Sequence, residues 1–187
     1  MYAPNVQVVN FSGSGIETTF TQGEDACLEA MVPTLAATDA EQLMVVGSLP
    51  DVVGDQFDRL FAAMGLENVV TLPAPTRDGM PGIGPGTKVL LAQPFLGETA
   101  TALTKRGAEI LRAPFPFGAD GTAAWLSAGA LAMGAERARS DAVMAVPHRR
   151  AAEAVARVAK DLTGRSRFFL PDSQLEIPLA RFLTREC

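Results

Sequence analysis

The sequence predicts an α/β fold, in which Rossmann-like parallel β-sheets carry helices on both faces. Short apolar segments alternate with helical segments of ten or more residues, which is the spacing of βαβ units. The segments 43–48 and 88–93 are apolar without alternation, as expected of strands buried on both faces. Loops rich in proline and glycine, at 73–87 and 114–121, separate the later units.

The first elements follow from local pattern. Residues 6–11 are expected to form a buried strand, and 23–35 a helix with Glu24 and Asp25 in its first turn, where carboxylates complement the helix dipole. After the strand 43–48, a helix opens at Pro50 and Asp51 and stops at Gly65. Its apolar face has helical spacing and comprises Val53, Phe57, Leu60, Phe61 and Met64.

The later elements repeat this alternation. Strands are expected at 68–73, 88–93 and 108–113, with a helix at 97–107 between the last two. A helix at 122–133 carries Trp125 as a core anchor, and the helical segment 136–164 is expected to break or kink near Pro147. A strand at 167–171 and a helix at 173–186 complete the pattern.

The pattern suggests parts of three α/β units. Residues 1–40 are expected to be the end of a first domain, 41–134 a second domain, 135–164 a connecting helix and 165–187 the start of a third domain. The chain begins almost inside a strand and stops within a helical pattern, so we expect a fragment of a longer protein.

Composition excludes several classes of protein. The net charge of −5 is unlike a nucleic-acid-binding surface, and no apolar run approaches the ~18 residues of a membrane span. The first residues do not resemble a secretory signal. Only Cys27 and Cys187 are present, so we do not expect a disulfide framework. We expect a cytoplasmic location.

The glycine loop behind the first strand does not fit a nucleotide site. Gly13 and Gly15 match the dinucleotide fingerprint, but Thr18 replaces its third glycine, and no Walker-type phosphate loop is present. The loop 12–18 is therefore either a site for another ligand or a capping loop, and the pattern leaves both open.

In open parallel sheets, ligands bind beyond the carboxyl ends of the strands. The loops there are apolar with a few hydrogen-bonding groups, which suits a flat organic ligand. No catalytic residue is assigned, and no metal ligand. The candidate pocket residues are Ser14, Gly15, Ile16, Glu17, Thr18, Phe95, Phe115, Phe117, Asp172 and Gln174.

Several of these residues have a structural alternative. Asp172 fits a helix N-cap, and Phe115 and Phe117 could simply plug the end of the sheet. His148, beside two arginines on a helix, is expected to be solvated, and Cys27 is expected to be a small core residue.

Five segments, GSGIETTFTQGED, VVGSLPDVVGDQ, LLAQPFLGETATAL, APFPFGADGT and FLPDSQLEIPLARFL, point to a family. Together they resemble the N subunits of light-independent protochlorophyllide reductases, which are similar to nitrogenase alpha subunits, over essentially the whole chain. The resemblance implies three Rossmann-like domains around a substrate cavity.

The resemblance also implies an activity and partners. The reaction is the reduction of the C17–C18 double bond in ring D of protochlorophyllide. A partner B subunit forms an N₂B₂ assembly, and an ATP-hydrolysing iron–sulfur L protein supplies electrons through a 4Fe–4S cluster shared by N and B.

The family's cluster cysteines precede the glycine loop and are not among these residues. The chain alone is therefore expected to hold no cluster and to be inactive. A subunit of another nitrogenase-like reductase, such as chlorophyllide reductase, and a stand-alone α/β binding module remain the alternatives.

Overall fold

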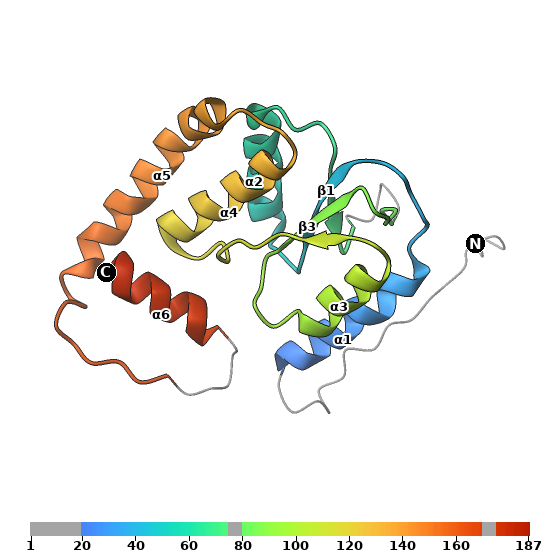
Figure 1. Ribbon diagram of the computed structural model, residues 1–187. Helices are drawn as coiled ribbons and strands as arrows, with labels where there is room; N and C mark the ends of the chain where they lie inside the picture. The colour runs from blue at the N-terminus through green and yellow to red at the C-terminus, as the bar shows by residue number, and fades with distance from the viewer. Residues whose placement is uncertain (1–19, 75–79, 170–174) are drawn as a thin grey trace, which may run out of the picture.

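A computed structural model describes residues 20–74, 80–169 and 175–187, and its centre is a sheet of parallel strands (Figure 1). The spatial order is β2-β1-β3-β4. These strands are β1 (Gln42–Val46), β2 (Val69–Leu72), β3 (Thr87–Leu91) and β4 (Glu109–Ile110). Leu43 of β1 pairs with Val69 on one side and Lys88 on the other. The predicted α/β class is confirmed.

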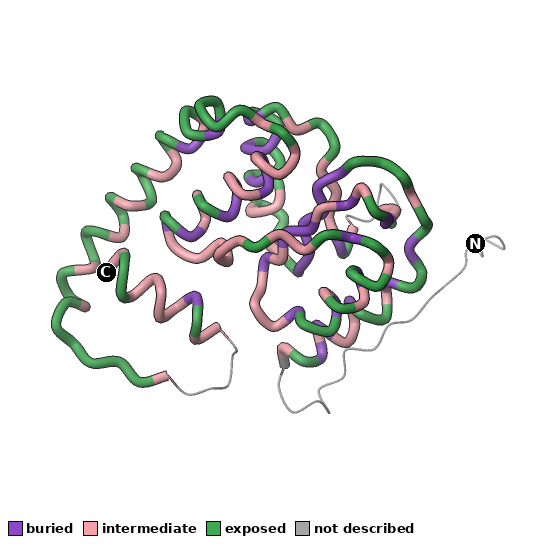
Figure 2. The backbone as a smooth tube through the Cα atoms, viewed as in Figure 1, coloured by how far each residue is buried: buried purple, intermediate pink, exposed green. Residues whose placement is uncertain are grey.

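Helices cover both faces of the sheet because side chains of β1 alternate between two apolar cores. Leu43 and Val45 face a core built with α2 (Asp51–Met64) and α4 (Gly118–Ala132). Met44 and Val46 face a second core built with α1 (Phe20–Met31) and α3 (Gly97–Lys105). All five residues of β1 are buried, as predicted from its lack of alternation, and Figure 2 shows burial concentrated along the sheet.

The predicted apolar face of α2 is largely confirmed. Phe57, Phe61 and Met64 are buried, and Gly65 ends the helix in the left-handed region at φ 98°. Trp125 is buried as predicted, packs against Phe57 with the rings tilted by 45° at a centroid distance of 5.0 Å, and donates a hydrogen bond to the Leu91 carbonyl.

Two helices extend the body beyond the sheet. The long helix α5 (Arg137–Ala159) packs against α4 and α2, and its second half extends past them (Figure 1). The helix is not broken at Pro147, because a proline inside a helix removes one hydrogen bond without removing its neighbours. Helix α6 (Glu176–Arg185) packs against α4.

Two strand predictions need correction. β4 comprises only Glu109–Ile110 of the predicted 108–113, since it lies at the edge of the sheet and the chain then turns away through Pro114. The predicted strand at 167–171 is not formed over the described residues 165–169, because no strand pairs with them there. The predicted strand at 6–11 lies outside the described residues.

The first helix also begins earlier than predicted. It starts at Phe20 and not at Gly23, and is followed by a 3₁₀ turn (Val32–Thr34). Glu24 and Asp25 are therefore not in its first turn, and their carboxylates contact other elements.

Candidate functional site

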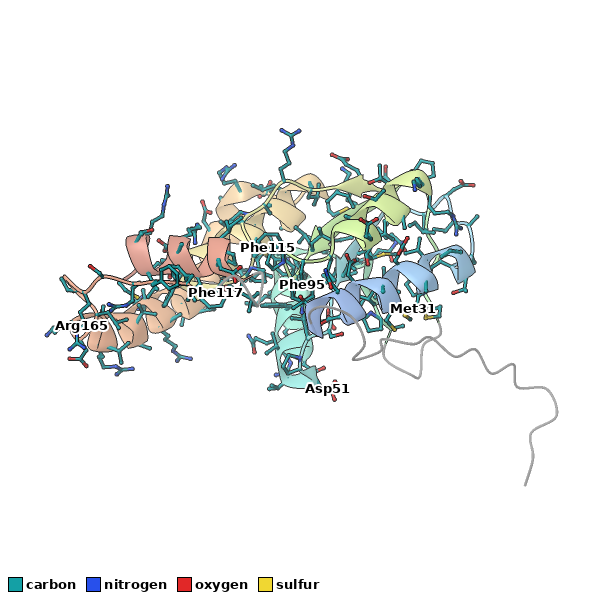
Figure 3. All side chains as sticks on the ribbon, turned by 90° about the horizontal axis from the view of Figure 1, so that it is seen from below. Met31, Asp51, Phe95, Phe115, Phe117 and Arg165 are labelled. Carbon is teal, nitrogen blue, oxygen red and sulfur yellow. The ribbon has the colours of Figure 1, made fainter. Side chains whose placement is uncertain are left out.

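The carboxyl edge of the sheet gathers three of the predicted pocket residues. Phe95 follows β3, while Phe115 and Phe117 follow β4, and all three are half-buried. Figure 3 shows them in the middle of the molecule, between α1 and α6. The other seven predicted residues, Ser14, Gly15, Ile16, Glu17, Thr18, Asp172 and Gln174, lie outside the described residues.

The three phenylalanines have different surroundings. Phe95 packs against the core beneath α1 and α3. Phe117 meets Phe182 of α6 edge-on, with ring centroids 5.6 Å apart, and its backbone amide donates to the Phe115 carbonyl. Phe117 therefore has a packing role that the sequence did not reveal, because Phe182 is 65 positions away in the printed sequence.

Carboxylates from remote helices occupy the N-termini of α3 and α4. Asp25 of α1 is 7% exposed and accepts hydrogen bonds from the amides of Glu98 and Thr99, at 3.0 and 2.9 Å, and from the Thr99 hydroxyl. Glu186 follows α6, has a side chain 5% exposed, and accepts from the Ala119 amide at 2.6 Å.

These contacts restrict what the carboxyl edge can bind. The free amides of a helix N-terminus are the usual place for a phosphate. At α3 the Asp25 carboxylate takes two of these amides, and at α4 the Glu186 carboxylate, which also pairs with Arg181, takes one, so both N-termini are less available to an anionic ligand. This arrangement agrees with the absence of a phosphate motif in the sequence and favours an uncharged face on the ligand.

The crevice between β1 and β3 is held by a polar network. The Ser48 amide donates to Glu24 Oε1 at 3.1 Å, and Gln93 Nε2 donates to the Ser48 carbonyl at 2.8 Å. Gln93 Oε1 is buried and has no hydrogen-bond partner among the described residues. Gly47, with φ 134°, lies directly against it, and a Cβ there would collide with this oxygen.

An acidic stripe borders the same edge on α2. Asp51, Asp55 and Asp58 are exposed and line a hollow of about 870 Å³, together with Ser48 and Thr71. Partial desolvation of the Asp58 carboxyl, whose residue is exposed overall, raises its pKa above the usual 3.8, and the neighbouring Asp55 charge adds to this. Within the described residues, none of the three carboxylates forms an ion pair.

At the opposite edge of the sheet, where the strands begin, side-chain cations bind carbonyls at the C-terminal ends of helices. Lys88 Nζ donates to the Ala132 carbonyl at the end of α4, and Arg139 Nε donates to the Ala63 carbonyl near the end of α2. Cations at helix C-termini complement the dipole. A hollow of about 440 Å³ is present there, but its arginine is engaged in this structural contact.

The sequence suggested that the single histidine is simply solvated, but in the structure its side chain has a partner. His148 Nε2 lies 2.7 Å from Asp120 Oδ1 and links α5 to the first turn of α4. The sequence did not reveal this contact, because helix packing brings together residues 28 positions apart. Both side chains are partly exposed, at 38% and 50%.

The described residues do not fit a 4Fe–4S cluster. Such a cluster needs about four ligands, usually thiolates, whereas the sequence contains only Cys27 and Cys187. Both cysteines are free and half-buried, and no group of three metal-ligating side chains occurs within 20–74, 80–169 and 175–187. Cys27 is thus less buried than the core position predicted for it.

None of the described helices combines the length and apolar character needed to cross a bilayer.

Comparisons with known proteins agree with this architecture. Subunit N of light-independent protochlorophyllide reductase from Dinoroseobacter shibae is 59% identical over 100% of this chain, and that from Rhodopseudomonas palustris is 54% identical over 99%. The chain spans 44% of the length of each of these two relatives. A family model described as nitrogenase component 1 type oxidoreductase matches residues 1–187. The chain therefore belongs to the nitrogenase component 1 type oxidoreductase family, as its motifs predicted.

Proposed function

We propose that this chain is a segment of the N subunit of a light-independent protochlorophyllide reductase, and that its carboxyl-edge loops line the pigment pocket of the complete subunit. The observation that carries the proposal is the identity of 54–59% to subunits of that name, over essentially the whole chain. The complete enzyme would reduce the C17–C18 double bond of ring D in protochlorophyllide.

The chemistry of the carboxyl edge supports a pigment more than a phosphorylated ligand. A tetrapyrrole is flat and largely apolar, so aromatic faces supply contact area while a few polar groups set its orientation. Phe95, Phe115 and Phe117 offer such faces, and the carboxylates of Asp25 and Glu186 already bind amides in the first turns of α3 and α4.

The finer assignments belong to the same proposal. Electrons would come from an ATP-hydrolysing iron–sulfur L protein with ferredoxin as their source, and a B subunit would complete an N₂B₂ assembly in the cytoplasm. Because these residues do not fit a 4Fe–4S cluster, the cluster ligands of the complex must lie on other segments. This chain would shape the pigment site and exclude water from it, and would be inactive by itself.

The proposal is tested with the complete subunit assembled with its B and L partners under anaerobic conditions in the dark. Protochlorophyllide and chlorophyllide are supplied in separate reactions with ATP and reductant, and the products are followed by absorption spectroscopy. We expect turnover of protochlorophyllide only. Turnover of chlorophyllide alone would assign the chain to chlorophyllide reductase, and turnover of neither would reject both activities.

A further inference from the structure

Between β1 and β3 the order of the strands reverses: β1 is followed along the chain by β2 on one side, and β3 by β4 on the other. The chain leaves β1 through α2 toward one face and leaves β3 through α3 toward the other, since these helices belong to opposite cores. The two connections diverge at the carboxyl ends of neighbouring strands. In open parallel sheets, such a point opens the crevice in which ligands bind.

In this protein the side chain of Gln93 occupies that crevice. Its Nε2 donates to the Ser48 carbonyl at 2.8 Å, which fixes the orientation of the amide, because the reverse orientation would set two oxygens against each other. Its Oε1 therefore lies against Gly47, which has no side chain to displace it. Gly47 and Ser48 in turn form part of the wall of the hollow beside α2.

The Oε1 atom has no hydrogen-bond partner within the described part of the chain, although it is buried. A buried carbonyl oxygen without a partner is unfavourable, and such atoms are rare in folded proteins. Gln42 is also on this sheet, at the amino end of β1, and its Nε2 donates to the Gly82 carbonyl and the Thr87 hydroxyl, so its amide group joins the β1–β3 pair far from the carboxyl edge.

We propose that the crevice between the carboxyl ends of β1 and β3 is a ligand subsite, in which Gln93 Oε1 accepts a hydrogen bond from an N–H or O–H group of the ligand or from a water bound to it. The inference rests on the proposed function, because it takes the pigment as that ligand. The amide nitrogen of Gln93 holds the Ser48 loop, and its oxygen orients the pigment.

Two substitutions separate the acceptor from the clamp on Ser48. Gln93→Met removes both the donor to the Ser48 carbonyl and the acceptor, whereas Gln93→Lys keeps an N–H donor for that carbonyl and has no acceptor. Gln42→Met is the matched control, because it removes an amide of the same type from the far end of β1. Each variant is made in the complete subunit assembled with its B partner.

Protochlorophyllide binding is measured by absorption titration, and stability by thermal unfolding of the same samples. We expect Gln93→Met and Gln93→Lys both to weaken binding about tenfold, as for the loss of one hydrogen bond, whereas only Gln93→Lys keeps an unfolding temperature close to that of the wild type. Gln42→Met should lower the unfolding temperature but leave the pigment affinity unchanged.

Three other results would overturn the inference. Wild-type pigment affinity in Gln93→Lys, together with weakened binding in Gln93→Met, would assign Gln93 a purely structural role on the Ser48 loop. Unchanged pigment affinity in Gln93→Met, with normal binding by the wild type, would remove the subsite while leaving the proposed function intact. If the wild-type complex binds no pigment, the proposed function fails, and this inference fails with it.

Discussion

Replacing Asp25 by alanine should free the N-terminus of α3, because this one carboxylate joins α1 to α3 across 74 positions of sequence. The carboxylate is 7% exposed and accepts from the amides of Glu98 and Thr99 and from the Thr99 hydroxyl. Removing it leaves the buried Thr99 amide and the partly buried Glu98 amide without their partner.

The magnitude follows from these contacts. A hydrogen bond to a charged group contributes about 1.5–3 kcal/mol, and a buried donor left unpaired loses about 1–3 kcal/mol. Because the contacts share one carboxylate and are not additive, we expect a total loss of about 3 kcal/mol. At about 1.4 kcal/mol per factor of ten, the amides of α3 should exchange with solvent roughly a hundredfold faster.

The assay is hydrogen–deuterium exchange of the peptide that covers 97–105, measured in the complete subunit so that only local opening is compared. Asp25→Asn should show a smaller increase, because the amide keeps one oxygen acceptor. Glu29→Ala is the matched control, since Glu29 is an exposed carboxylate on the same helix. If Asp25→Ala exchanges no faster than Glu29→Ala, the carboxylate does not stabilise the N-terminus of α3 and the reasoning is wrong.

Three further predictions concern packing, charge and metal content. A double-mutant cycle of Phe117→Leu and Phe182→Leu should give a coupling energy of about 1 kcal/mol in thermal unfolding, because the rings meet edge-on, and additive losses would show that the pair is not coupled. Asp58→Asn should raise the free energy of unfolding at pH 7 by up to about 0.5 kcal/mol, since the raised pKa means that folding disfavours the charged carboxylate. The gain should vanish below the usual pKa of 3.8, where the acid is protonated in both states, and a gain that persists there would contradict the electrostatic cause. Anaerobic reconstitution of the 187-residue chain should yield no stoichiometric 4Fe–4S cluster in iron and sulfide analysis, because two cysteines cannot supply its ligands, and a full cluster per chain would refute this.

Local pattern alone predicted most of the elements in this chain. The apolar run of β1 predicted a strand buried on both faces, because polar and apolar residues do not alternate in it. The spacing of apolar residues along α2 predicted which of them face the core. Gly65 ended that helix as expected, since glycine adopts a positive φ without a steric penalty. The motifs then identified the family, because they occur in order along the whole chain.

The polar contacts of the carboxyl edge could be found only in the tertiary structure. The sequence placed Asp25 in the first turn of its own helix, but the helix begins earlier and the partners of Asp25 are on α3, while Glu186 caps α4 from 67 positions away. Likewise His148 meets Asp120, and Gln93 meets Ser48. Hydrophobic periodicity is a property of a single helix or strand, so it can be recognised in the sequence. A hydrogen bond between two elements depends on the order of the strands and on how the helices pack, and no local pattern encodes either.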